Sequence, residues 1–302
     1  MTPSLEEIPY GTHALQTITV AKPYPAPPHN DDRSSYWVIL IHGGAWRDPS
    51  QTSSSYLTPA LNILSSSPSS ESSIQNKIIG YASISYRLSP HPSYPQDPST
   101  ESPNTLRAAS HPDHISDVIG ALSVLEERYK IGNRYILVGH SCGATLAFQA
   151  VMRSVSYSFS SQAYPLPVAI LGMAGIYDLR KLRDAHKDIS AYQEFIEGAF
   201  GADEVGWDAA SPGVVRGEEG VEGWDEGRVV VLAHSEGDGL CDVAQSEGMR
   251  RSLGEWDKDR ERGEREVHFL SIEGEHDEAW EKGGELAKGI LFTLARLQEM
   301  GV

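Results

Sequence analysis

Short apolar segments alternate along this chain with longer segments of helical period. Near-continuous apolar runs are typical of strands that are covered on both faces. Their alternation with helical segments is typical of a mostly parallel sheet with helices around it. We therefore predict an α/β fold with helices on both faces of a central sheet. The clearest strand candidates are Tyr36–Ile41, Ile78–Tyr86, Tyr135–Val138, Val168–Leu171, Arg228–Ala233 and Val267–Ile272.

Between the strand candidates, Ile115–Tyr129 places apolar residues at helical spacing, which predicts a helix with one stripe on the sheet. We expect the segments that look inserted to be solvated loops or weakly ordered edges. None is long enough to form a domain, so residues 1–302 are predicted to form one domain, with Asp178–Pro212 as a small helical cap. The inserted segments are Ser65–Ser73, Pro90–Ser110, Gly213–Gly227 and Gly254–Glu266.

The charge of the chain limits its partners. With 42 acidic and 25 basic residues the formal net charge is −17, which repels phosphate backbones and anionic membranes. No apolar run approaches the roughly 20 residues of a membrane helix, and the N-terminus lacks the basic start and apolar core of a secretory signal. The two cysteines, Cys142 and Cys241, do not suggest a disulfide framework. We expect a cytoplasmic enzyme without a nucleic-acid or membrane partner and leave its oligomeric state open.

A G-x-S-x-G pattern follows the strand candidate Tyr135–Val138 and precedes an apolar helical segment. This is the context of a nucleophile elbow, the tight turn that exposes a catalytic serine. Such a turn needs residues without bulky side chains on either side of Ser141, and Gly139 and Gly143 meet this requirement. The pattern predicts that Ser141 is a nucleophile.

A second glycine pattern, His42-Gly43-Gly44-Ala45-Trp46, follows the first strand candidate. In serine hydrolases a loop here supplies N–H donors for the oxyanion of the tetrahedral intermediate. We expect the backbone N–H groups of Gly44, Ala45 and Cys142 to form this oxyanion hole. Trp46 either packs in the core or forms an aromatic wall for the substrate.

A triad on this fold follows the chain order serine, acid, histidine. His276 lies in a loop after the last strand candidate, whereas His268 lies inside that strand, so we predict His276 as the general base. Asp238, in the loop after the strand candidate Arg228–Ala233, is the predicted acid that orients the imidazole. Asp242 and Glu236 are alternatives in the same loop. Asp178 is more simply explained as a helix N-cap.

The cluster His111, Asp113 and His114 offers three possible metal ligands within four residues. It opens an amphipathic helix, where Asp113 and His114 are expected to cap the helix or face solvent. No cysteine cluster or HExxH pair supports a metal site. We therefore predict an enzyme without a metal or other cofactor.

Taken together, these motifs resemble kynurenine formamidase of the fungal type, within the hormone-sensitive-lipase-like α/β-hydrolases. The similarity extends from about Tyr10 to His276, and its most specific element is H-G-G-x-W. The matching segments are His42–Trp46, Gly139–Gly143, Gly175–Leu179, Ala210–Pro212, His234–Asp238 and His276–Asp277.

The resemblance implies an α/β-hydrolase fold in which Ser141, Asp238 and His276 form the triad and Gly44, Ala45 and Cys142 the oxyanion hole. It also implies the reaction, hydrolysis of N-formyl-L-kynurenine to L-kynurenine and formate in tryptophan degradation. The inserted loops make the substrate less certain than the reaction type. Two alternatives stay open: a small-acyl carboxylesterase with the same triad, and a non-catalytic ligand-binding homologue.

Overall fold

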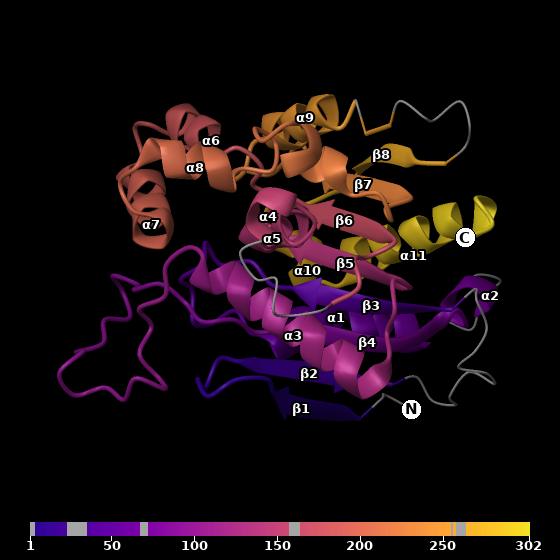
Figure 1. Cartoon of the computed structure of the whole chain (residues 1–302), viewed down its shortest axis with the longest axis horizontal. Coiled ribbons are helices and arrows are strands. Elements are labelled where there is room, and N and C mark those ends of the chain that lie inside the picture. Colours follow the sequence, from indigo (N-terminus) through magenta and orange to yellow (C-terminus); the bar gives the residue numbers. More distant parts are fainter. Residues whose placement is uncertain (1–3, 23–34, 67–71, 157–163, 255, 258–263) are drawn as a thin grey trace.

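The computed structural model describes residues 4–22, 35–66, 72–156, 164–254, 256–257 and 264–302. Its centre is an eight-stranded sheet in the order β1-β2-β4-β3-β5-β6-β7-β8 (Figure 1). From β4 to β8 all neighbouring strands are parallel, whereas β2 pairs antiparallel with β1 and with β4. The strands are β1 (Leu5–Pro9), β2 (Thr17–Ala21), β3 (Tyr36–Ile41), β4 (Ile78–Ile84), β5 (Tyr135–His140), β6 (Ala169–Met173), β7 (Val229–His234) and β8 (Glu266–Ser271).

The predicted α/β architecture is confirmed, since every predicted strand occurs as one of β3 to β8 with small differences at its ends. β1 and β2 were not predicted. β1 is an exposed edge strand in which Ile8 is the buried residue, so it lacks the apolar run that reveals a central strand. β2 is a five-residue segment.

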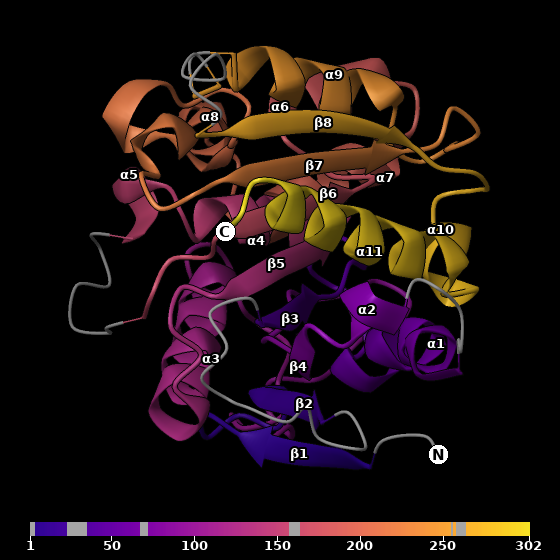
Figure 2. The ribbon, with the colours of Figure 1, turned by 90° about the vertical axis from the view of Figure 1, so that its right-hand side faces the viewer.

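Helices cover both faces of the sheet (Figure 2). α1 and α11 lie on one face, and α3, α4 and α9 lie on the other. This arrangement confirms the predicted layers. The helices outside the cap are α1 (Ser53–Ser66), α2 (Ser72–Gln75), α3 (Asp113–Tyr129), α4 (Cys142–Gln149), α5 (Arg153–Ser156), α9 (Val243–Ser252), α10 (Glu278–Glu281) and α11 (Gly284–Glu299).

Alternate side chains of the central strands belong to two separate apolar cores. In β3, Val38 and Leu40 pack with α1 and α11, whereas Ile39 and Ile41 pack with α3 and α4. All six residues of β3 are buried. A strand covered on both faces needs apolar side chains at every position, which is why its sequence reads as a continuous apolar run.

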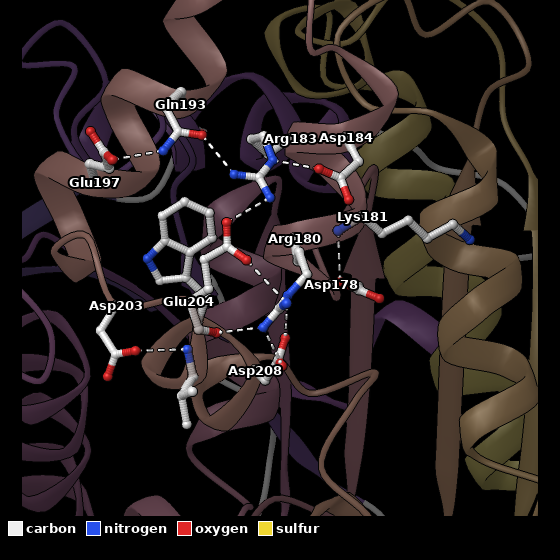
Figure 3. Close-up of polar contacts among 12 residues, drawn as sticks. Asp178, Arg180, Lys181, Arg183, Asp184, Gln193, Glu197, Asp203, Glu204 and Asp208 are labelled. Carbon is white, nitrogen blue, oxygen red and sulfur yellow. Dashed lines mark hydrogen bonds and ion pairs between the residues drawn. The ribbon is translucent and has the colours of Figure 1, made fainter.

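A group of short helices, α6 (Leu179–Ala185), α7 (Ser190–Phe200) and α8 (Glu204–Ala210), lies together at one end of the sheet (Figure 1). Polar contacts join these helices (Figure 3). Arg180 pairs with Asp208 at 2.7 Å, and Arg183 donates to Gln193 at 2.8 Å. These two arginines on α6 therefore connect it to both α8 and α7.

The inserted segments differ in structure. Pro90–Ser110 contains turns but neither helix nor strand, as predicted. Of Ser65–Ser73, residues 67–71 lie outside the described residues, and the described ends continue α1 and begin α2 rather than forming loop.

The prediction of purely solvated loops was wrong at two tryptophans. Trp224 and Trp256 are buried and stack with ring centroids 5.3 Å apart. Trp224 lies in Gly213–Gly227, which also contains the 3-10 helices η2 (Gly217–Glu219) and η3 (Val221–Gly223). Trp256 lies in Gly254–Glu266, of which residues 255 and 258–263 are outside the described part. Burial of two large rings anchors both segments to the core.

Within the described residues, no helix combines the length and apolar character needed to cross a membrane.

Candidate active site

Four loops that follow parallel strands meet at one edge of the sheet. Gly44 follows β3, Ser141 follows β5, Asp238 follows β7 and His276 follows β8. The carboxyl ends of parallel strands lie at the same edge, so side chains far apart in sequence gather there. A cavity of about 390 Å³ opens at this edge and is lined by Gly44, Ser141 and His276, among others.

Ser141 has the strained backbone of a nucleophile elbow, with φ 54° and ψ −122°. It stands between β5 and the first residue of α4. A Cβ on Gly143 would lie 2.3 Å from the carbonyl oxygen of Ile41, and one on Gly139 would lie 2.3 Å from that of Gly143. The two flanking glycines are therefore required by close backbone packing, which confirms the steric reason for the motif.

Asp238 and His276 form a buried hydrogen-bonded pair. Nδ1 of His276 lies 2.7 Å from Oδ2 of Asp238, whose side chain is 1% exposed. The other oxygen, Oδ1, accepts the backbone N–H groups of Leu240 and Cys241, each at 2.9 Å. Burial alone would raise the pKa of Asp238, but hydrogen bonds from His234 and His276 outweigh it, so this pKa lies well below its usual value. The carboxylate is thus charged and accepts the Nδ1–H of His276, which leaves Nε2 of the ring with its lone pair.

A second histidine contacts the same carboxylate. Nε2 of His234 lies 2.8 Å from the carbonyl oxygen of Cys241 and 3.3 Å from Oδ2 of Asp238. Because a carbonyl only accepts, Nε2 carries the proton, and Nδ1 accepts from the Ser246 hydroxyl at 2.7 Å. Sequence analysis assigned no role to His234. Its position four residues before Asp238, at the end of β7, was the available signal.

His140, the residue before Ser141, is hydrogen-bonded to the loop that carries His276. Its Nε2 donates to the backbone oxygen of His276 at 3.0 Å, and the two rings lie 4.6 Å apart. Burial lowers the pKa of His140 well below its usual value, so the ring is neutral. A neutral ring in this place supports the His276 loop without adding a second positive charge beside it.

Residues 42–46, which we call the Gly-Gly loop, lie next to the elbow. Gly44, Ala45 and Trp46 all have positive φ, at 91°, 49° and 59°. The backbone N–H of Trp46 donates to Sγ of Cys142 at 3.3 Å. The Cys142 thiol, fully buried, therefore ties the loop to the first turn of α4. Burial raises its pKa to about 11, so it remains a thiol.

Trp46 lies behind the pocket wall. Its side chain is fully buried, with its ring 5.0 Å from Phe200 and 6.3 Å from Phe195, and it is not among the residues that line the cavity. Of the two alternatives from the sequence, this placement favours core packing. Contact between Trp46 and a substrate stays a prediction.

The cavity wall beyond the triad is largely apolar and comes from the cap and from the loop after β7. Tyr192 and Phe195 project from α7, and the Tyr192 hydroxyl donates to the carbonyl oxygen of Leu240 at 2.7 Å. The remaining apolar lining consists of Ala45, Ile176, Leu182, Ile189, Ala191, Leu240 and Cys241. Such a wall suits an aromatic ring.

The other acids and histidines considered from the sequence have separate contacts. Asp178 caps α6 by accepting the N–H of Lys181 at 2.9 Å, as expected. His268 lies on β8 and contacts Glu266 at 2.7 Å. Glu236 is exposed, and Asp242 lies 3.0 Å from His186 rather than from His276.

The expectation that His114 faces solvent or caps the helix was wrong. The ring is completely buried, and the Ser89 hydroxyl lies 3.1 Å from its Nε2. Burial lowers the pKa of His114 to about 3.

Within the described residues, His140, His276 and Asp277 form a cluster of possible metal ligands. Each offers one atom, and these atoms lie within 4.8 Å of one another. All three already make hydrogen bonds within the protein, including Asp277, which accepts from Nε1 of Trp280 at 3.0 Å. Their arrangement therefore fits a hydrogen-bonded catalytic loop, and independence from metal stays a prediction.

Two solved structures with a similar fold are esterases. Esterase B from Lactobacillus rhamnosis superimposes with a TM-score of 0.68 over 99% of this chain and 87% of its own, at 16% identity. A truncated carbohydrate esterase from gut microbiota gives a TM-score of 0.62 over 100% of this chain and 98% of its own, also at 16% identity. These similarities show the α/β-hydrolase fold.

Comparison with curated sequences is more specific, although no family model matches the chain. A kynurenine formamidase-like hydrolase of Fusarium equiseti is 39% identical over 91% of this chain and 88% of its own. A kynurenine formamidase of Aspergillus versicolor is 32% identical over 93% of this chain and 96% of its own. With identity at this level across most of both chains, the protein is a hydrolase and belongs to the kynurenine formamidase family.

Proposed function

We propose that this protein hydrolyses N-formyl-L-kynurenine to L-kynurenine and formate, with Ser141 as nucleophile, His276 as general base and Asp238 as the acid that orients it. The observation that carries the assignment is the 2.7 Å contact between Asp238 and His276 beside the strained Ser141, in a chain of the kynurenine formamidase family.

In the first half of the reaction, Oγ of Ser141 attacks the formyl carbon and its proton passes to Nε2 of His276. The tetrahedral intermediate collapses, the C–N bond breaks, and the arylamine leaves with the proton from His276. Ser141 then carries a formyl ester. In the second half, His276 takes a proton from water, the hydroxide attacks the ester, and formate leaves as Oγ recovers its proton.

The oxyanion formed in both halves would be held by the backbone N–H groups of Gly44, Ala45 and Cys142. Cys142 is the first residue of α4, where the N–H has no partner within the helix and the helix dipole favours negative charge. Gly44 lines the cavity beside Ser141, and the Cys142 thiol holds the Gly-Gly loop in its positive-φ conformation. N–H donors held in place in this way would stabilise the charge of the transition state.

Helices α6 to α8, within residues 178–212, are proposed as a cap on a single catalytic domain. Leu182, Tyr192 and Phe195 of these helices line the cavity and would cover the aromatic ring of the substrate. An arylamine is a better leaving group than an alkylamine because its lone pair is delocalised, so an apolar wall for the aryl group suits this reaction. We also propose action in the cytoplasm, where the buried thiols Cys142 and Cys241 stay reduced.

The test is to incubate the purified protein with N-formyl-L-kynurenine and to follow the absorbance of kynurenine. The same preparation is assayed with short aryl esters such as phenyl acetate. We expect kcat/KM for the formamide to exceed that for the ester. Ester turnover without formamide turnover would instead assign a small-acyl carboxylesterase. A lack of both activities, together with no labelling of Ser141 by a fluorophosphonate, would indicate a non-catalytic protein.

A further inference from the structure

A second cavity of about 450 Å³ adjoins the active-site cavity. Its walls are the inserted segment Pro90–Ser110 and helix α7, and it shares Arg47 and His91 with the lining of the first cavity. Arg47 directly follows the Gly-Gly loop. The Arg47 side chain therefore stands where a substrate bound at Ser141 would extend toward the inserted segment.

Cationic and acidic side chains both stand at this boundary. The formal net charge of the chain is −17, yet the guanidinium groups of Arg47 and Arg107 both line the second cavity, together with the carboxylate of Glu194. Burial, and then the positive charge of Arg47, lowers the pKa of His91, while the negative charges of Asp48 and Glu194 act in the opposite direction. The two guanidinium groups on one cavity wall are candidate donors for an anion.

Both guanidinium groups have donors to spare. Arg47 uses Nη1 for Glu194 at 2.5 Å, while its side chain is 13% exposed and its guanidinium lies 5.8 Å from the centroid of Phe195. Arg107 donates through Nη2 to the carbonyl oxygen of Tyr94 at 2.6 Å, and its Nε is buried without a partner in the described structure. A guanidinium has five N–H donors in a fork that matches a carboxylate.

We propose that Arg47, assisted by Arg107, binds the carboxylate of a formamide substrate that carries an amino-acid end. This inference rests on the proposed function and names the part of the protein that recognises the end of the substrate remote from Ser141. The formyl group lies at Ser141, the aryl ring lies against Tyr192 and Phe195, and the charged end points to the second cavity.

Glu194 has a defined part in this arrangement. Its side chain is 54% exposed, and an ion pair this open to solvent contributes little to stability. Glu194 therefore pairs with the Arg47 guanidinium and would compete with the carboxylate of a substrate for it. Substitution of Glu194 is a matched control for substitution of Arg47. Either substitution breaks the ion pair between the two residues, but only substitution of Arg47 removes the cation.

The experiment compares two substrates with the same reacting group. N-formyl-L-kynurenine has the amino-acid end, and 2-formamidoacetophenone keeps the aryl ketone and formamide without it. For Arg47→Gln we expect KM for N-formyl-L-kynurenine to rise by about 10- to 100-fold with little change in kcat, the size of a lost charge-assisted contact made equally in ground and transition states. KM for 2-formamidoacetophenone should change less than about 2-fold, a difference below that of an ordinary hydrogen bond.

Glu194→Gln is expected to leave KM for N-formyl-L-kynurenine at the wild-type value or to lower it. Arg107→Gln is expected to raise this KM by a smaller factor than Arg47→Gln does. Arg47→Lys, which keeps the charge but loses the fork, should recover part of the affinity. Circular dichroism melting of each variant checks that the fold is retained.

The inference is overturned if Arg47→Gln raises KM equally for both substrates, or if Glu194→Gln reproduces its effect, since either result would assign the pair to tethering the cap. Wild-type enzyme that hydrolyses 2-formamidoacetophenone but not N-formyl-L-kynurenine also overturns it. If the wild type hydrolyses neither formamide, the proposed function itself fails and the inference fails with it.

Discussion

Oδ2 of Asp238 lies 2.7 Å from Nδ1 of His276, and the two side chains come from the loops after neighbouring strands β7 and β8. The contact fixes the tautomer of the imidazole, because the carboxylate accepts only from a protonated Nδ1. The remaining nitrogen is then free to take a proton from Ser141.

Asp238→Asn is predicted to lower kcat by about three to four orders of magnitude while leaving the fold intact, because an amide can stabilise the wrong tautomer of His276. Ser141→Ala and His276→Ala should each be at least as damaging, and the double variant little worse than either, since the three residues act as a unit. Steady-state kinetics with N-formyl-L-kynurenine provide the measurement. Retention of more than about a tenth of wild-type activity by His276→Ala would require another base.

His234 is predicted to be a positioning residue for the acid. His234→Phe removes the Nε2–H beside Asp238 and Cys241, so we expect kcat/KM to fall by about 10- to 100-fold, as for loss of a hydrogen bond to a buried charge. His234→Gln, which offers an amide N–H, should recover part of the loss. In an Asp238→Asn background, His234→Phe should have a much smaller effect. If His234→Phe lowered kcat/KM by the same factor in the wild-type and Asp238→Asn backgrounds, His234 would act independently of Asp238.

Acid is predicted to destabilise the protein through its buried histidines. Burial lowers the pKa of His42 to about 4 and of His114 to about 3, and it also lowers the pKa of His140. In the unfolded chain each binds a proton near pH 6.5. The unfolded state therefore binds more protons below that pH, and the stability present above it is lost as the pH falls toward 4.

Each such histidine contributes about 1.4 kcal/mol per pH unit to this loss. Urea unfolding at a series of pH values between 7 and 4.5 measures the total slope. In His114→Gln the amide can still form a hydrogen bond with Ser89. This variant should reduce the slope of unfolding free energy against pH by the contribution of one histidine, about 1.4 kcal/mol per pH unit. An unchanged slope in this variant would show that His114 does not remain neutral in the folded protein.

Trp46→Phe is predicted to affect stability more than catalysis. The indole is fully buried against Phe195 and Phe200, and its Nε1 is buried without a partner in the described structure. Loss of packed ring area should lower the melting temperature by several degrees, as expected for roughly 1 to 3 kcal/mol. Both kcat and KM of the folded enzyme should stay nearly unchanged. A several-fold fall in kcat/KM at unchanged melting temperature would instead place Trp46 in the substrate site.

Activity is predicted to be independent of metal. The reaction proposed above needs only Ser141, His276 and Asp238, and His140, His276 and Asp277 each make a hydrogen bond within the protein. Dialysis against a chelator should leave kcat/KM unchanged. Loss of activity that zinc restores would contradict the mechanism.

Local features of the sequence were sufficient for the central sheet and for the elbow. β3, β5 and β7 are buried along their whole length and begin with at least four consecutive apolar residues because both faces are covered, and this requirement is visible in a short segment. The glycine motif around Ser141 is likewise recognised from five consecutive residues, although only Gly139 packs within its own turn and Gly143 packs against the carbonyl oxygen of Ile41 in the neighbouring strand. The chain order of Ser141, Asp238 and His276 then followed from the order of the strands.

Contacts between distant segments were decided only by the tertiary structure. β1 joins the sheet as an exposed edge, His114 is buried next to Ser89, and His234 shares Asp238 with His276. None of these features can be predicted from periodicity, because each depends on which distant segments pack against one another in the folded chain.

Apolar runs and glycine motifs are short patterns, so the fold class, the nucleophile loop and the candidate catalytic residues could be predicted from the amino-acid sequence. The position of Trp46 behind the pocket wall, and the pairing of Arg47 with Glu194 of α7 between two cavities, became visible only in the folded chain. Burial and charge pairing are properties of the packed chain, in which a side chain's surroundings come mostly from residues far away in sequence.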